Sequence, residues 1–438
     1  MCQSNSHGHP HHHHHHHRHH HDHPHPARPD REQAHDHPDR DRSPRLDRRQ
    51  ALARLKAAGL VAAAAAGSPW GSVVRAVADD GKAAAASGAA ARLFDIKPVA
   101  PGVFGAIAKR TAMLNCNAAI VVNRDHVLVV DTHSKPSAAR ALIRQIRAEV
   151  TQLPVRYVVD SHLHNDHAMG NGAYPEAFGA SVEVISSVKT REWLERLGVP
   201  RLQETLNSLP RQIAELRARR EASHDESARA ELATHIEGLE AYLKEMTPAR
   251  VTLPTMTFER RLVIHRGGRE IHLLFLGRAH TAGDIVAYIP SERVVATGDL
   301  LHGILPYIGD GFPDEWPATL RALEALDFDR VIPGHGSIQE GKSVLSQFRG
   351  YVEEVTEKVA RGIERGQPAD ELVKAITADT LSSLKADDMR RRVNRELTAV
   401  FSLQERTPGM LPESVATNVR EVFTYFKERK GRREMPQK

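Results

Sequence analysis

The sequence has few cysteines, few aromatic side chains and no long hydrophobic run. Only Cys2 and Cys116 occur among its 438 residues, which excludes a disulfide framework and a cysteine-based zinc finger. Hydrophobic residues make up 40% of the chain, charged residues 26% and aromatic residues 5%. This balance is typical of a globular protein and excludes collagen, a membrane-spanning bundle and a wholly disordered chain. Any metal site must therefore use histidine and carboxylate ligands.

The chain also lacks a basic surface of the kind that attracts nucleic acid. It contains 60 Lys and Arg against 55 Asp and Glu, a net charge of +5. Most of this excess lies in residues 1–78, so the remaining chain is nearly neutral. We therefore expect no nucleic-acid partner.

Residues 1–46 form a low-complexity tract that holds more than half of the 28 histidines. Such a composition cannot bury a core, so we expect this tract to be disordered. Its imidazoles are either loose ligands for zinc, copper or nickel or only part of a solvated tail. The tract is therefore no guide to function.

Residues 47–78 have the pattern of an export signal. Arg48 and Arg49 precede an Ala-rich apolar stretch, and the segment ends at Ala78. It resembles a twin-arginine signal, which implies export of the folded protein to the periplasm by the twin-arginine machinery and cleavage near Ala78. The stretch is too short and too weakly hydrophobic to span a membrane, and the alternative is an ordinary Ala-rich helix. A linker over 79–91 follows.

Beyond residue 91, short apolar runs rich in β-branched residues alternate with helical stretches. The expected strands are Ala118–Asn123, His126–Asp131, Val155–Asp160, Val182–Ser186, Leu262–His265, Ile271–Gly277, Asp284–Ile289, Arg293–Thr297 and Arg330–Pro333. The clearest expected helices are Ser137–Val150 and Glu315–Leu326. This order predicts an α/β or α+β domain over residues 92–340, with sheets covered by helices.

Two further regions are predicted to be helical throughout. Residues 189–247 are charged and nearly free of strand formers, which predicts an inserted helical hairpin with breaks at Gly198-Val199-Pro200 and near Ser223. Its role is open between a solvated arm and a lid or dimer element. Residues 341–438 predict a helical C-terminal subdomain that runs to about Lys430, and no motif there indicates a function.

The run after Val155–Asp160 is dense in histidine, with His162, His164, Asp166 and His167 close together. In an extended backbone His162 and His164 lie on the same side, about 6.6 Å apart, so both imidazoles can bind one cation. The chain then turns, and Asp166 and His167 can bind a second. This run resembles the His-x-His-x-Asp-His signature of the metallo-β-lactamase superfamily, whose fold is a four-layer αβ/βα sandwich with the metals between its two sheets.

The resemblance implies three more ligands, and the sequence supplies them in the family's order. They are His280, Asp299 and His335, each after an expected strand. The resemblance assigns His162, His164 and His280 to one metal, assigns Asp166, His167 and His335 to its neighbour, and places Asp299 as the bridge. Asp131 and His133 are expected to support the ligands, His133 through hydrogen bonding. His302 and Tyr307 either contact substrate or merely pack.

Imidazole and carboxylate ligands suit zinc best, although iron or manganese is chemically acceptable. The resemblance thus implies two Zn²⁺ and a hydrolase in which a hydroxide bridging the metals attacks a small-molecule substrate, with Asp166 and Asp299 orienting it and relaying its proton. Asp299 agrees with thioesterase, lactonase and phosphodiesterase branches rather than with lactamases that carry Cys or Ser there. The lack of an Arg or Lys grouping favours an ester, thioester, lactone or lactam over a phosphate.

Two alternatives from other classes remain open. A metal-binding or trafficking module using the His-rich tract predicts a variable metal content and no hydrolysis. An iron-dependent oxidoreductase on the same fold predicts visible absorption and oxygen consumption, but the retained Asp166 and His335 disfavour a single-iron site. The sequence leaves the oligomeric state open.

Overall fold

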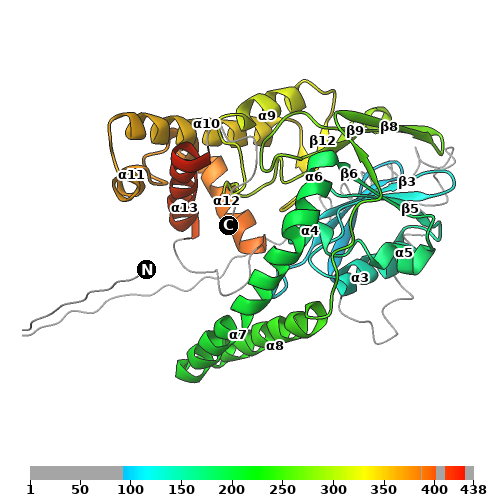
Figure 1. The fold of residues 1–438 in the computed structure, drawn as a ribbon, viewed down its shortest axis with the longest axis horizontal. Helices are drawn as coiled ribbons and strands as arrows, with labels where there is room; N and C mark the ends of the chain where they lie inside the picture. The colour runs from blue at the N-terminus through cyan, green and yellow to red at the C-terminus, as the bar shows by residue number, and fades with distance from the viewer. Residues whose placement is uncertain (1–91, 386, 401–409, 430–438) are drawn as a thin grey trace, which may run out of the picture. The chain divides into compact units, whose positions relative to one another are not determined.

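The computed structural model describes residues 92–385, 387–400 and 410–429. The expected His-rich tract, export signal and linker lie outside these residues. One set of strands runs from residue 94 to residue 187, long helices follow to residue 246, a second set of strands ends at residue 340, and helices complete the chain (Figure 1).

The first sheet has seven strands that neighbour one another in sequence order. They are β1 (Phe94–Ala100), β2 (Val103–Ala108), β3 (Ala118–Val122), β4 (Val127–Val130), β5 (Val155–Val159), β6 (Glu183–Ser187) and β7 (Met256–Phe258). Strands β1 to β4 pair antiparallel, whereas β4 to β7 pair parallel. Parallel neighbours need a crossover, and α3 (Pro136–Glu149) and α5 (Ala173–Phe178) lie in two of these connections.

The second sheet has six strands in the order β13-β12-β11-β10-β9-β8. They are β8 (Arg261–Arg266), β9 (Arg269–Leu274), β10 (Val286–Ile289), β11 (Val294–Gly298), β12 (Arg330–Pro333) and β13 (Gln339–Glu340), with the 3-10 turn η3 (Pro290–Glu292) before β11. Only β11 and β12 pair parallel, and α9 (Trp316–Glu324) lies in the connection between them.

The two sheets pack face to face, and helices cover their outer faces. Leu128 and Val130 of β4 face the second sheet in the cluster that contains Leu273, whereas Val129 faces α3 and contacts the cluster of Leu142. A strand buried on both faces explains the continuous apolar runs in the sequence. On the other side, α9 packs against the second sheet. The predicted four-layer sandwich is confirmed.

All nine expected strands are present, but the sequence did not reveal β1, β2, β7 and β13. Pro98 interrupts β1, where the register with β2 shifts between Pro98 and Ala100. Proline is tolerated there because β1 is an edge strand. Gly105 interrupts the apolar pattern of β2, and a Cβ at this position would lie 3.2 Å from Ile338. Strands β7 and β13 are too short to show a period.

The inserted region consists of α6 (Val188–Trp193), the π-helical turn η2 (Leu194–Gly198), α7 (Val199–Ala222) and α8 (Glu226–Met246). At the expected break, Gly198-Val199-Pro200, η2 ends and α7 begins, but Gly198 keeps helical dihedral angles (φ −59°, ψ −47°), so the chain passes between them without a loop. Pro200 lies in the first turn of α7, where its missing N–H breaks no helical bond. The break near Ser223 is confirmed, and the Asp225 side chain caps α8 by accepting from the backbone N–H groups of Ser227 and Ala228.

The C-terminal region is helical, as expected, in its described residues. It consists of α10 (Ser343–Glu364), α11 (Ala369–Ala375), the 3-10 turn η4 (Ser382–Leu384), α12 (Asp387–Val400), α13 (Met410–Thr424) and the π-helical turn η6 (Tyr425–Arg429). Val355 of α10 and Val415 of α13 share one buried cluster with the outer face of the second sheet. In the described part of the chain, no helix combines the length and apolar character that crossing a membrane requires.

Candidate metal centre

The histidine-rich run lies at the carboxyl end of β5, a central strand of the first sheet. His162 and His164 are in the loop after β5, and Asp166 and His167 lie in the single turn of α4 (Asn165–Ala168). The loop after β4 holds this turn, since the Thr132 N–H donates to the His167 carbonyl at 2.7 Å. A Cβ on Gly170 would lie 1.9 Å from the Thr132 carbonyl oxygen, so only glycine fits there.

The other ligand positions come from the second sheet. His280 lies in the loop between β9 and β10, Asp299 follows β11 directly, and His335 is two residues beyond β12. Since β11 and β12 are parallel, Asp299 and His335 emerge at the same edge of the sheet. The Gly334 N–H donates to the Gly298 carbonyl at 2.9 Å, and a Cβ on Gly334 would lie 2.0 Å from Asp299 Oδ1. Glycine at 334 thus allows the two loops to approach.

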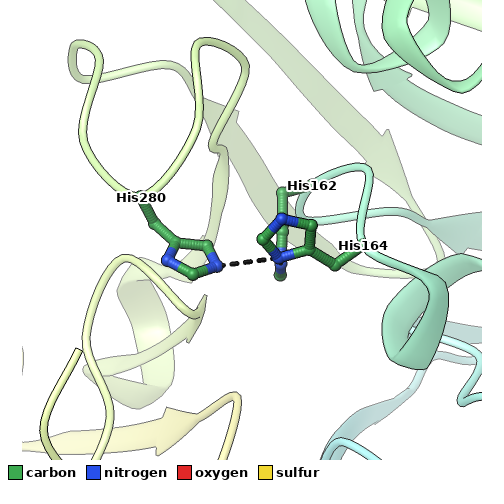
Figure 2. A group of neighbouring side chains, drawn as sticks. All are labelled: His162, His164 and His280. Carbon is green, nitrogen blue, oxygen red and sulfur yellow. Dashed lines mark hydrogen bonds between the residues drawn. The ribbon is translucent and has the colours of Figure 1, made fainter. Parts of the chain in front are cut away.

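Three imidazoles meet in the first half of the site. Nδ1 of His164 lies 3.1 Å from Nε2 of His162 and 2.9 Å from Nε2 of His280. Figure 2 shows the three rings turned toward one another from two separate loops. These nitrogen atoms could hold one metal ion, and the structure brings them together as the sequence predicted.

The outer nitrogens of these rings determine where the protons are. Nδ1 of His280 lies 3.0 Å from the Tyr307 carbonyl oxygen, which can only accept, so this nitrogen donates. Nε2 of His164 lies 2.8 Å from the Asp310 carboxylate and donates in the same way. The inner nitrogens, Nδ1 of His164 and Nε2 of His280, therefore both present lone pairs at 2.9 Å. A cation between them satisfies both, which a hydrogen bond does not.

The second half of the site mixes imidazole and carboxylate. Nε2 of His335 lies 3.1 Å from Asp166 Oδ2, and Nε2 of His167 lies 3.4 Å from the same oxygen. Nδ1 of His167 donates to Asp131 Oδ2 at 2.9 Å, so Asp131 orients the ring with Nε2 toward the site. Asp166, His167 and His335 could hold a second metal ion.

Asp299 lies between the two halves. Its Oδ2 is 3.5 Å from Nε2 of His280 on one side and 3.5 Å from Nε2 of His335 on the other. Its Oδ1 is 3.5 Å from Nε2 of His167, is buried and makes no hydrogen bond in the structure. A buried carboxylate oxygen without a hydrogen-bond donor destabilises the folded state. A cation bound beside it would supply the missing partner.

The two halves differ in their electrostatics. Burial, reinforced by the neighbouring imidazole of His164, lowers the pKa of His280 to about 3, so this ring is neutral. Burial would also lower the pKa of His335, but the carboxylates of Asp299 and Asp166 outweigh it and raise that pKa to about 9. The imidazoles of His335 and His167 hold the pKa of Asp299 well below its usual range in spite of burial. A cation entering the second half therefore displaces a proton.

Asp131 and His133 lie behind the ligands, at the end of β4. The Asp131 carboxylate accepts from the Ser161 backbone N–H at 2.8 Å and from His167, so it orients a ligand. Nδ1 of His133 donates to the Cys116 carbonyl at 3.1 Å, and its ring stacks on Phe94. His133 thus hydrogen-bonds to the wall of the site rather than to a ligand. Burial raises the pKa of Cys116 to about 12, so this thiol stays protonated.

Asp310 and Arg201 also act on the site, and the sequence did not reveal them. The Asp310 carboxylate accepts from His164 Nε2 and also from both terminal nitrogens of Arg201, each at 2.8 Å. Burial would raise the pKa of Asp310, but the bonds from His164 and Arg201 hold it well below its usual range. Arg201 lies in the first turn of α7, so the insertion orients a candidate ligand through one bidentate ion pair.

A cavity of about 510 Å³ opens in front of the ligands. His302 and Tyr307, the candidates for substrate contact, both line it. His302 is buried and its Nδ1 donates to the Ile304 carbonyl at 3.1 Å, whereas Tyr307 is 49% exposed and its ring lies 5.7 Å from that of His164. The opposite wall is formed by α13, which no sequence signal indicated.

Comparison with known proteins places this arrangement in a family. A model of the metallo-beta-lactamase superfamily matches residues 112–335. Metallo-beta-lactamase type 2 of Bacteroides fragilis is 25% identical over 128 residues, which are 25% of this chain and 51% of that protein. The 2,4-dinitroanisole O-demethylase subunit alpha of Nocardioides sp. (strain JS1661) is 24% identical over 214 residues, 48% of this chain and 49% of that protein. The chain thus spans about half the length of these relatives.

Among solved structures, a metallo-beta-lactamase from Pontibacter korlensis matches with a TM-score of 0.44 and 17% identity, over 59% of this chain and 99% of that one. The family model covers just over half of the sequence and includes every candidate ligand. The chain therefore belongs to the metallo-β-lactamase superfamily.

Proposed function

We propose that the chain is a metal-dependent hydrolase that binds two divalent cations, preferably zinc, and cleaves an ester, thioester, lactone or lactam bond in a small molecule. One observation carries this proposal. Inner nitrogens of His164 and His280, 2.9 Å apart, both present lone pairs to a buried space that also contains Asp299 Oδ1, which has no hydrogen-bond partner. Imidazole and carboxylate donors of this kind suit zinc.

The candidate ligands form two groups, one for each cation. His162, His164 and His280 would hold one cation, Asp166, His167 and His335 would hold the other, and Asp299 would bridge. When bound, such cations lower the pKa of a water molecule to about 7 and polarise a substrate carbonyl.

Two carboxylates of the chain would accept the proton of the attacking water and transfer a proton to the leaving group. Asp299 and Asp166 are both ionised, because neighbouring imidazoles lower their pKa values in spite of burial. Asp299 Oδ1 can therefore accept the proton of the attacking water. The Asp166 side chain is 21% exposed and lines the cavity, so it can pass a proton to the leaving group.

The test uses the full chain loaded with zinc, assayed against a panel of lactams, lactones, thioesters, esters and phosphodiesters. We expect hydrolysis of a carbonyl substrate, and Asp299→Ala should lower kcat/KM about 1,000-fold while the fold persists. His224→Ala is the matched control, since His224 is exposed in the turn between α7 and α8. Full activity of Asp299→Ala contradicts the proposal, and visible absorption with oxygen consumption would indicate an oxidoreductase instead.

We also propose that the protein is exported to the periplasm by the twin-arginine route, on the basis of Arg48, Arg49 and the segment that ends at Ala78. Cell fractionation tests this. The double variant Arg48→Lys and Arg49→Lys should keep the protein inside the cell at its full length. Unchanged secretion of that variant would refute this route.

A further inference from the structure

The last described helix forms one wall of the cavity in front of the candidate metal ligands. Met410, Glu413, Ser414 and Thr417 of α13 line the cavity together with Glu421. Their spacing of three to four residues places them on one face of the helix. Leu411, Val415 and Val419 are buried in the cluster that also contains α10. Helix α13 therefore packs with one face and presents another to any molecule in the cavity.

Helix α13 is hydrogen-bonded to the loop between β11 and α9, and that loop in turn contacts His280. The Asn418 side chain donates to the Pro306 carbonyl at 2.7 Å, and Glu421 Oε2 accepts from the Ile308 N–H at 2.9 Å. Pro306 and Ile308 flank Tyr307, whose carbonyl accepts from His280. Helix α13 is thus linked to His280 by two successive sets of hydrogen bonds, one to the segment around Tyr307 and one from His280 to the Tyr307 carbonyl.

The wall differs in charge from the rest of the cavity. The described residues that line the cavity include no lysine and no arginine, and most of those outside the candidate ligands are apolar or uncharged. Glu413 is exposed, and no ion pair of Glu413 occurs within the described part of the chain. Glu421 adds a second carboxylate, although it is engaged by Ile308 and Asn418. A carboxylate or phosphate at this end would meet like charge without a counter-ion.

We propose that α13 selects the substrate and that the substrate is a carbonyl compound with an apolar body and a positively charged amine or ammonium end. Its carbonyl lies at the metal ligands, its body contacts Leu305 and Met410, and its cationic end lies beside Glu413. This inference rests on the proposed hydrolase function and narrows it to substrates without a carboxylate at the end remote from the ligands.

The test uses three 4-nitrophenyl esters and the zinc-loaded full chain. The acyl chains are equal in length and end in trimethylammonio, tert-butyl or carboxylate, so the first two groups differ in charge and hardly in shape. We expect kcat/KM to be highest for the trimethylammonio ester, lower for the tert-butyl ester and lowest for the carboxylate ester. The first and last should differ at least tenfold. Glu413→Lys should invert the preference between the cationic and anionic esters, and Glu413→Gln should reduce the ratio for the cationic over the neutral ester.

Glu371→Gln is the matched control, because Glu371 is exposed on α11 and does not line the cavity. If the esters are hydrolysed but the order is flat or favours the carboxylate, the inference fails and the hydrolase function stands. If none is hydrolysed, the substrate panel described above decides the proposed function, and equilibrium binding of the corresponding amides decides the inference. Tighter binding of the ammonium amide, weakened by Glu413→Lys, supports it, and equal binding of all three overturns it.

Discussion

Two helical regions are added to the sandwich, and they reach the candidate metal centre from different sides. The insertion touches it through Arg201, which pairs with Asp310 behind the His164 ligand. The C-terminal region touches it through α13, which lines the cavity in front of the ligands. The sequences of both are charged and amphipathic, so composition does not separate them. One addition thus contacts a candidate ligand from behind, while the other lines the cavity in front of the candidate ligands.

Among the changes that test this comparison, loss of Asp310 should have the largest effect, a fall in metal affinity. Asp310→Ala removes the acceptor for Nε2 of His164, so the ring can change tautomer and turn away. Zinc affinity should fall about 10- to 100-fold. Competition with a chelator, followed by metal analysis, measures this in the full chain, where the His-rich tract contributes equally to wild type and variant. Asp310→Asn retains an acceptor and should lose less.

Arg201 provides the matched pair for this prediction. Arg201→Ala should reproduce part of the Asp310→Ala loss, and Arg201→Lys should restore little of it, because an ammonium group cannot make both 2.8 Å bonds of the guanidinium. The KM of a cationic ester should change less than the zinc affinity. If Arg201→Ala alters KM and leaves zinc affinity intact, the insertion acts on substrate and the contrast between the two regions disappears.

The sequence predicted the candidate ligands and the supporting residue Asp131, but it missed Asp310 and Arg201. His162, His164, Asp166 and His167 fall within six consecutive positions after a strand, so a local pattern was enough to predict them. The bond of His164 to Asp310 joins residues 146 positions apart, and no local pattern marks such a pair. Long-range register, which tertiary packing decides, places Asp310 beside His164.

The same limit applies to the helices. Arg201 is one of several arginines in α7, and nothing in its neighbourhood distinguishes it from those exposed to solvent. The sequence predicted only that residues 341–438 are helical, because what the polar face of α13 contacts depends on how the C-terminal helices pack on the second sheet. The expected break at Gly198-Val199-Pro200 is a change from π-helix to α-helix without a loop, because Pro200 fits the first turn of α7.

An intermediate effect is expected from Asn418, which joins α13 to the rest of the site. Asn418→Ala leaves the Pro306 carbonyl and the Tyr351 hydroxyl without a buried partner, at a cost of about 1–3 kcal/mol in the free energy of unfolding. Because the wall then loosens, KM should rise several-fold while zinc affinity changes little. Denaturant titration, steady-state kinetics and metal analysis measure the three quantities. A drop in zinc affinity as large as that of Asp310→Ala would show that both regions act on the metal.

The smallest effect we expect is a loss of stability at low pH. It should occur in the C-terminal helices and not in the insertion. Glu354 of α10 accepts from the backbone N–H groups of Ser382 and Ser383. Burial would raise the Glu354 pKa, but these bonds outweigh it and lower the pKa from 4.5 to about 2. The stability that Glu354 contributes is therefore present above about pH 4.5 and is lost as the pH falls toward 2. Since this side chain is partly exposed, the contribution is no more than about 1 kcal/mol.

Glu354→Gln should remove this pH-dependent loss of stability in the C-terminal helices and leave the stability of the insertion unchanged. Hydrogen exchange at pH 3 and pH 6, compared between wild type and variant, resolves the regions separately. Amides of α10 and η4 should exchange faster in wild type at the lower pH than intrinsic chemistry explains, and amides of α7 and α8 should not. If the amides of all four elements exchange equally faster at pH 3, the two helical regions open as one unit. Their separate contacts would then no longer support separate effects on the candidate ligand and on the substrate.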